Sequence, residues 1–226
     1  MPKVSRGGKR GSGGAVQPVT PQNTTPIPDY MDPAKNPDNL PQNMFNALGQ
    51  KGSEINSITA SKNTNPNYQQ GKQWRINCQR CIYAYEMQRR GYDVTAQPNL
   101  NNAHYSDGFD MRYSGGYRNV FQGQKWANVG GKRVKAQVTN IENQMATWGE
   151  GSRAAVMVVW KRGNSGHVFN VEQKNGKLLA VDAQRGKKID ISRYIGDSKL
   201  KYTQISRIDN LTTPTDNLLK CITKRS

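Results

Sequence analysis

The stretch GHVFNVEQKNGKLLAVD, residues 166–182, decides the fold. Two predicted strands, 167–173 and 177–182, flank Lys174-Asn175-Gly176. An Asn-Gly pair between two such segments is a strong signal for a β-hairpin. We therefore predict an antiparallel sheet built around this hairpin.

The hairpin places a histidine and a carboxylate on one face. If Asn175-Gly176 form the loop, His167 lies opposite Gln184 and diagonal to Asp182, whereas a Lys174-Asn175 loop places His167 opposite Asp182. Both registers put His167 and Asp182 on the same face, because strand side chains alternate. Opposite and diagonal neighbours lie within roughly 5 to 8 Å. A carboxylate at that distance orients an imidazole and stabilises its protonated form, so we expect a base and its orienting group.

A cysteine begins the first strong helical segment. The sequence NCQRC at 77–81 opens an apolar segment over residues 78–90, which predicts a helix with Asn77 as its cap and Gly91 as its stop. The free amides and the dipole at a helix start stabilise a thiolate. Cys78 is therefore the predicted nucleophile, with His167 as its base.

The same helix start would also stabilise the oxyanion of a tetrahedral intermediate. Its free amides point toward a group bound beside the thiol. Gln73, five residues before Cys78, would add a side-chain donor. We expect Gln73 and Asn77 to support the site in this way.

Cys81 is the alternative nucleophile, but a cysteine one turn into an apolar helix is typical of a core position. The Cys78-x-x-Cys81 spacing also allows half of a zinc site. Only Cys221, His104 and His167 are available to complete it, at spacings that match no known ligand set. No strand-helix-strand pattern for a redox motif surrounds the pair. We therefore expect neither a metal nor a cofactor.

The remaining periodicity completes an α+β domain. Val134, Val138, Ile141, Met145 and Trp148 form one apolar stripe of a predicted helix. The continuous apolar run 153–160 predicts a strand buried on both faces. Further elements are expected at residues 92–96 (strand), 190–195 (short helix) and 201–208 (strand). Helices followed by an antiparallel sheet define the α+β class.

Composition divides the chain into three parts. Apolar residues make up 34% of the 226 residues, which is low for a compact domain of this length. Residues 1–64 are rich in Gly, Pro and Asn and basic at their start, and they predict a flexible tail or linker with short helical pieces at 40–48 and 53–60. Residues 65–215 would form the catalytic domain, and residues 216–226 a basic C-terminal tail.

Charge and cysteine content bear on partners and compartment. The 33 Lys and Arg residues against 16 Asp and Glu give a net charge of +17, which favours nucleic acid, an acidic protein or an anionic surface as a partner. Three cysteines do not make a disulfide framework. No segment is long enough to span a membrane, and no apolar run follows Met1–Arg10 to form a secretory signal. We expect the protein in the cytoplasm of a target or host cell, or packaged in a virion.

Several motifs together carry a family resemblance: Asn65-Pro66-Asn67-Tyr68, Asn77-Cys78-Gln79-Arg80-Cys81, Tyr85-Glu86 with Arg90-Gly91-Tyr92-Asp93-Val94, Gly166-His167 with Asn170, and Asp182-Ala183-Gln184 with Gly186. Over about residues 65–195 the chain resembles the papain-fold toxin domains of bacterial polymorphic toxin systems, which are grouped with glutamine deamidases. The resemblance implies a papain-like fold whose N-terminal catalytic helix packs on an antiparallel sheet. It also implies Cys78 as nucleophile, His167 as base, Asp182 as orienting group and Gln184 as a supporting polar residue.

The resemblance implies a cysteine-dependent amidohydrolase that acts on a protein glutamine, in a toxin or effector of bacterial or phage origin. A protein substrate and an immunity protein are the partners expected of such a toxin. A cysteine protease or a transglutaminase-like acyl transferase remains an alternative, because these enzymes share the attack of the thiol. A different alternative is a non-catalytic, basic virion or nucleic-acid-binding protein that contacts nucleic acid through its N-terminal tail.

Overall fold

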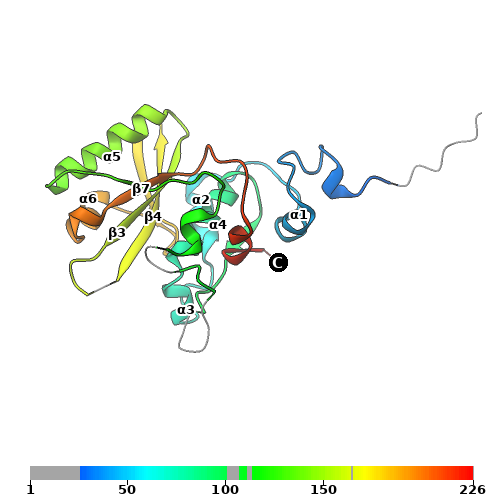
Figure 1. The fold of residues 1–226 in the computed structure, drawn as a ribbon, viewed down its shortest axis with the longest axis horizontal. Coiled ribbons are helices and arrows are strands. Elements are labelled where there is room, and N and C mark those ends of the chain that lie inside the picture. Colours follow the sequence, from blue (N-terminus) through cyan, green and yellow to red (C-terminus); the bar gives the residue numbers. More distant parts are fainter. Residues whose placement is uncertain (1–25, 101–106, 111–113, 164, 226) are drawn as a thin grey trace, which may run out of the picture.

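A six-stranded antiparallel sheet forms the centre of the molecule (Figure 1). The structure is a computed structural model that describes residues 26–100, 107–110, 114–163 and 165–225. The strand order is β2-β7-β3-β4-β5-β6. The bounds are β2 Ala127–Asn128, β3 Arg153–Val159, β4 Gly166–Lys174, β5 Lys177–Asp182, β6 Lys187–Lys188 and β7 Gln204–Arg207.

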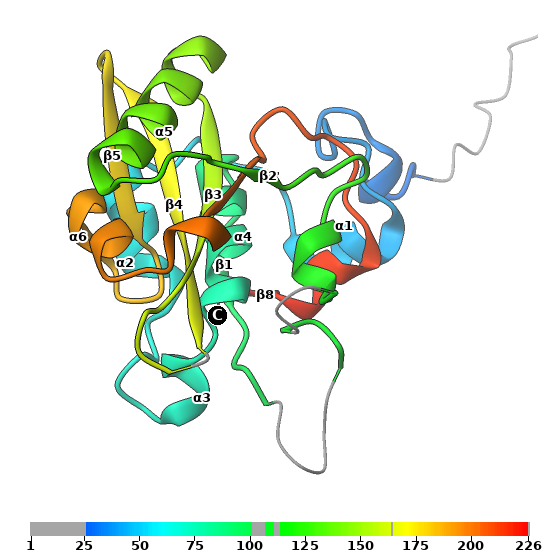
Figure 2. The same cartoon turned by 60° about the vertical axis from the view of Figure 1, so that its left-hand side comes forward.

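Helices cover both faces of this sheet (Figure 2). One face packs against α5 (Val134–Trp148) and α6 (Ile191–Gly196), and the other packs against α4 (Cys78–Arg89) and α2 (Ser57–Thr64). Side chains of β3 alternate between two cores, with Val156 on the α5 side and Met157 on the α4 side. The prediction of an α+β fold with a central strand buried on both faces is therefore confirmed.

The β4–β5 hairpin has the first of the two predicted registers. Lys174 pairs with Lys177, so Asn175 and Gly176 form a two-residue turn with φ angles of 53° and 69°. Such left-handed angles are those that Asn-Gly turns adopt. Pairing ends at Asn170 and Val181, after which the chain turns away, so Gln184 does not pair with His167.

Helix α4 begins at Cys78 and is buried along nearly its whole length. All of its residues after Gln79 are buried. It ends at Arg89, and Gly91 follows with a φ angle of 101°, in the left-handed region that favours glycine. The prediction of this helix and of its glycine stop is confirmed.

A buried carboxylate attaches α4 and α2 to the sheet. Glu172 of β4 accepts hydrogen bonds from the Ser57 hydroxyl at 2.6 Å, the Tyr85 hydroxyl at 2.6 Å and Arg89 Nε at 2.7 Å. A buried carboxylate needs such partners, because an unpaired charge in the interior is costly. This network helps to hold α4, which begins at Cys78, against the sheet.

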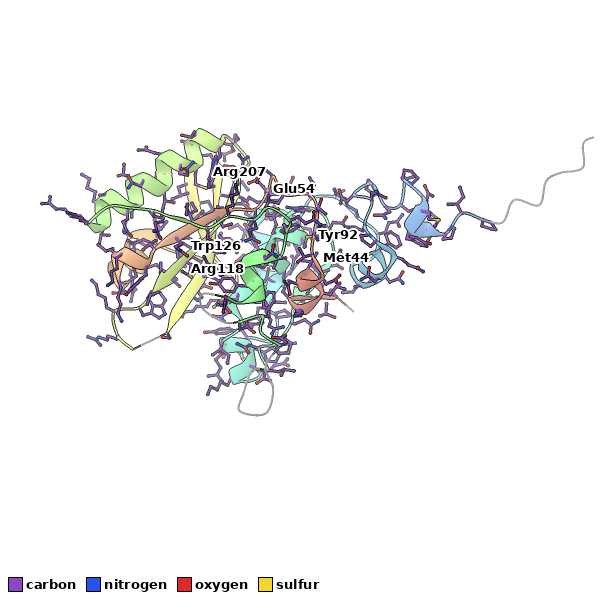
Figure 3. All side chains as sticks on the ribbon, in the orientation of Figure 1. Met44, Glu54, Tyr92, Arg118, Trp126 and Arg207 are labelled. Carbon is purple, nitrogen blue, oxygen red and sulfur yellow. The ribbon has the colours of Figure 1, made fainter. Side chains whose placement is uncertain are left out.

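The structure corrects the predicted N-terminal tail. Residues 26–64 contain η1 (Asp29–Met31), α1 (Gln42–Leu48) and α2, and they bury Leu40, Met44, Leu48 and Ala60 in the core that contains α4. Met44 and Tyr92, which are labelled in Figure 3, both belong to this core. The helical pieces expected at 40–48 and 53–60 correspond to α1 and α2, but these helices pack in the core and not in the flexible tail predicted from composition. Residues 1–25 lie outside the described residues.

The predicted C-terminal tail also differs from the structure. Residues 216–224 form η4 (Asp216–Lys220) and β8 (Ile222–Lys224), and β8 pairs with β1 (Val94–Ala96) in a second, two-stranded sheet. Leu218, Cys221 and Ile222 are buried in the same core. These apolar residues are buried although lysines surround them in the sequence, and for this reason the segment is not a tail.

Short elements complete the described chain: α3 (Lys72–Arg75), η2 (Gly116–Asn119) and η3 (Leu200–Tyr202). The strand expected at 201–208 is the shorter β7, and the helix expected at 190–195 is α6, whose cap Asp190 accepts a hydrogen bond from the Ser192 amide. Within the described residues, no helix has both the length and the apolar character needed to cross a bilayer.

Candidate active site

The thiol of Cys78 lies at the first position of α4 and is partly exposed, whereas Cys81 is buried. Cys78, Gln79 and His167 line a cleft of about 240 Å³, between the start of α4 and the ends of β3 and β4. Among the described residues, the backbone amides of Cys78 and Gln79 have no hydrogen-bond acceptor. They are therefore available to an oxyanion formed beside the thiol.

The imidazole of His167 connects the thiol to a carboxylate. His167 is the second residue of β4, and its Nε2 lies 3.2 Å from Asp182 Oδ2, with side chains that are 10% and 1% exposed. Burial lowers the pKa of His167, but the contact with Cys78 and the interaction with Asp182 outweigh it and raise this pKa from 6.5 to about 10. An imidazole with Nε2 toward the carboxylate leaves Nδ1 for the thiol. The geometry therefore favours a protonated imidazole beside the sulfur.

The carboxylate of Asp182 is held from three sides. Besides His167, the Tyr194 hydroxyl donates to Oδ2 at 2.7 Å, and the Arg185 amide donates to Oδ1 at 3.2 Å. Burial raises the pKa of Asp182, yet these partners bring it below its ordinary value of 3.8. Asp182 therefore stays ionised while it orients the imidazole.

An aromatic wall surrounds the imidazole. The Trp160 ring stacks on His167 with ring centroids 6.0 Å apart and planes 18° apart, and Tyr194 lies 5.8 Å from both rings. The sequence prediction missed Trp160 and Tyr194. Trp160 ends an apolar strand and Tyr194 lies in a short helix, so neither has a spacing that signals the site.

Asn77 supports the helix start in a different way from the predicted cap. Its side chain accepts no capping hydrogen bond from the helix. Instead, Asn77 Oδ1 accepts from Asn65 Nδ2, Gln184 Nε2 and Cys81 Sγ, each at 3.3 Å, and Nδ2 donates to the Gln97 carbonyl at 3.0 Å. Gln184 therefore contacts Asn77, the residue before Cys78. Asn65 also belongs to this network, and the sequence prediction missed it.

The structure does not bring Gln73 to the thiol. Gln73 lies in α3, and its side chain folds back over Gly71, where an added Cβ would lie 2.5 Å from Gln73 Oε1. Gln73 is not among the residues that line the cleft. The predicted oxyanion role of Gln73 is therefore not supported, because the short α3 turns its side chain toward its own backbone.

Burial distinguishes Cys81 and Cys221 from the partly exposed Cys78. It raises the pKa of the Cys81 thiol well above its usual value, and it also raises the pKa of Cys221. A buried thiol of high pKa is a poor nucleophile. Among the described residues, no three His, Cys, Asp or Glu side chains gather closely enough to hold a metal ion. His104, considered above as a ligand, lies outside the described residues.

A thiol at a helix start that meets a histidine and a carboxylate from an antiparallel sheet defines the papain-like fold class. Comparison with known families agrees. Residues 76–187 match the family described as papain fold toxin 1, glutamine deamidase, which supports the papain-fold toxin domain expected from the sequence. No curated protein and no solved structure matches the chain.

Proposed function

We propose that this protein is a cysteine-dependent amidohydrolase that converts a glutamine side chain of a protein substrate to glutamate. The main support for this proposal is the partly exposed thiol of Cys78 at a helix start. This thiol contacts the imidazole of His167, which Asp182 orients. The match of residues 76–187 to a family described as a glutamine deamidase supports the choice of a carboxamide as the group attacked. The assignment of Cys78, His167 and Asp182 as the catalytic residues is part of this proposal.

Catalysis proceeds through a thioester. The Cys78 thiolate attacks the carboxamide carbon, and the amides of Cys78 and Gln79 stabilise the oxyanion. His167 gives its proton to the departing nitrogen, which leaves as ammonia. The neutral imidazole then takes a proton from water, and the resulting hydroxide attacks the thioester. Collapse of this intermediate releases glutamate and regenerates the thiolate, so the net change is the exchange of NH2 for OH.

The direct test is to follow ammonia release and the mass increase of a glutamine-containing protein incubated with the full chain. The proposal expects both products with the wild-type chain and neither with Cys78→Ala. Peptide cleavage without ammonia would instead identify a protease. Incorporation of an added amine in place of water would identify a transglutaminase, since the two alternatives differ from the deamidase only in the leaving group or the acceptor.

A second candidate function rests on charge. The net charge of +17 favours binding to nucleic acid, and the basic residues before residue 26 would carry it. The test deletes residues 1–25 alone, because residues 40–64 pack into the core. Salt-dependent DNA binding that disappears with this deletion leaves the folded domain free for catalysis. Binding that persists favours a non-catalytic, nucleic-acid-binding protein.

A further inference from the structure

A second, larger groove adjoins the aromatic wall of the site. It has a volume of about 930 Å³ and lies between β6, α6 and the turn after β3. Trp160 and Tyr194 line it, and the same two rings pack against His167. The groove therefore begins on the other side of the wall that encloses the imidazole.

Six cations line this groove, which we call the basic groove. They are Lys161, Arg162, Arg185, Lys187, Lys188 and Arg193. Only two carboxylates, Asp190 and Asp197, lie among them, and Asp190 accepts a hydrogen bond from the Ser192 amide at the start of α6. The groove consequently carries a strong excess of positive charge.

The cations of the groove lack the acidic partners that four arginines in or near the core have. Arg80, Arg89, Arg90 and Arg153 each form ion pairs with a carboxylate in or near the core. Within the described part of the chain, none of the six groove cations does so. Charges left without counter-ions on a concave surface attract an oppositely charged ligand and accelerate its association.

We propose that the basic groove docks an acidic segment of the substrate protein, while the target glutamine of that protein reaches Cys78. The proposal rests on the proposed function, because it takes the docked segment to belong to the molecule that is deamidated. Carboxylates of the segment pair with Arg162, Lys188 and Arg193, whose side chains are exposed. Docking beside the site raises the local concentration of the amide without changing the chemical step.

The rings of the groove favour a polypeptide over a nucleic acid. Single-stranded nucleic acid binds through bases stacked on free aromatic faces. Here Trp160 stacks on His167, and Tyr194 packs edge-on against Trp160 while its hydroxyl bonds Asp182. Both rings pack against His167, so a base that displaced either ring would also disturb the imidazole.

Docking of an acidic segment would also affect the hydrogen bonds of Asp182 through Arg185. The Arg185 side chain interacts with the Tyr194 hydroxyl, and its amide bonds Asp182. An acidic segment that draws the guanidinium away would leave Tyr194 to donate to Asp182 alone. For this reason the test below leaves Arg185 unchanged.

The test uses full-length chains that carry Cys78→Ala, so that binding is measured without turnover. The probe is a fluorescent peptide of consecutive glutamates, followed by anisotropy at low and at physiological salt. The groove variant is Lys188→Glu with Arg193→Glu. Its matched control, Lys125→Glu with Lys135→Glu, changes the same charge at exposed positions outside the groove.

We expect the groove variant to bind the peptide about tenfold more weakly than the control, with the larger loss at low salt, because charge pairs are screened by salt. A control that loses as much affinity as the groove variant overturns the proposal, since net charge alone would then explain binding. A single-stranded oligonucleotide that binds through the groove more tightly than the peptide overturns it in favour of nucleic acid.

Two further measurements distinguish a failure of the docking proposal from a failure of the proposed deamidase function. With Cys78 intact, a blocked glutamine dipeptide that is too small to reach the groove should be hydrolysed equally by wild type and groove variant. If wild type hydrolyses no glutamine amide, the proposed function fails, while the binding experiment still decides the docking. The neutral variant Lys188→Gln with Arg193→Gln replaces the charge reversal if the latter does not fold, and it must also weaken peptide binding.

Discussion

At the scale of single residues, burial distinguishes the two thiols of α4. Cys78 and Cys81 lie one turn apart on α4, yet only Cys78 reaches the cleft. Cys81 donates to Asn77 Oδ1, and burial raises its pKa. The two cysteines therefore have different expected roles despite their short spacing.

Cys78→Ala should reduce ammonia release to background while the free energy of unfolding stays close to that of wild type. Cys81→Ala should keep most of the activity and destabilise the fold by about 1–2 kcal/mol, because it removes a buried sulfur. Activity assays paired with urea unfolding measure both effects. A dead Cys81→Ala chain with a fully active Cys78→Ala chain would show that the nucleophile is assigned wrongly.

His167 should make stability depend on pH. Burial lowers the pKa of the imidazole, but the contacts with Cys78 of α4 and Asp182 of β5 raise it to about 10. The ring of Tyr194 in α6 also packs against the imidazole. A raised pKa means that the folded state binds the proton more tightly than the unfolded state. Its stabilising contribution is therefore complete below pH 6.5 and disappears as the pH rises toward 10.

The measurement compares unfolding free energies of wild type and His167→Gln from pH 6 to pH 10, where wild type should lose more stability. Titration of the imidazole by NMR adds a second check. Because Cys78 is the largest of the causes that raise this pKa, Cys78→Ala should lower it. An unchanged imidazole pKa in that variant would argue against contact between the two side chains.

Tyr194 acts as a positioning residue through Asp182. Tyr194→Phe removes one of the hydrogen bonds to this carboxylate and leaves the ring in place. A hydrogen bond to a charged group contributes roughly 1.5 kcal/mol or more, so we expect kcat to fall about tenfold with little change in KM. Tyr30→Phe, on η1, is the control and should leave both constants unchanged. A change confined to KM would assign Tyr194 to substrate binding instead.

At the scale of elements, a buried carboxylate joins α4 and α2 to the sheet, in addition to the ion pair between Glu86 of α4 and Arg153 of β3. Glu172 of β4 holds Ser57 of α2 together with Tyr85 and Arg89 of α4. These bonds involve the middle and the C-terminal end of α4, whereas Cys78 at its first position is only partly buried and borders the cleft.

Glu172→Ala should destabilise the protein by about 3–5 kcal/mol, because it leaves the buried Arg89 without its main partner. Glu142→Ala, on the exposed side of α5, is the matched control and should stay within about 0.5 kcal/mol of wild type. Denaturant unfolding of both variants measures the difference. Equal, small effects would mean that packing rather than this network holds α4.

At the scale of the whole molecule, the ends of the described chain complete the core. Residues from α1 and β8 bury apolar side chains against α4 and β1. We therefore expect deletion of residues 1–25 to leave the melting temperature unchanged and deletion of residues 1–49 to lower it strongly, because the second deletion exposes that apolar surface. Thermal unfolding of the two truncated chains provides the measurement. Equal melting temperatures would show that α1 contributes nothing to the core.

Local patterns made much of the fold predictable. The Asn175-Gly176 turn, the stripe of α5 and the start of α4 at Cys78 depend on neighbouring residues, and each agrees with the structure. The tails were predicted from composition, which averages over a segment and does not show whether a short helix within it packs on the core. Their burial depends on partners elsewhere in the chain.

The sequence by itself determined that His167 and Asp182 share a face, because side chains alternate along strands, and that Cys78 begins a helix. Only the tertiary structure decided that this helix start meets the imidazole, since the packing of α4 on the sheet depends on distant residues. The same packing brings Trp160 and Tyr194 around His167 and turns Gln73 away. Contacts between distant segments leave no period in a sequence, and for this reason only the folded chain shows them.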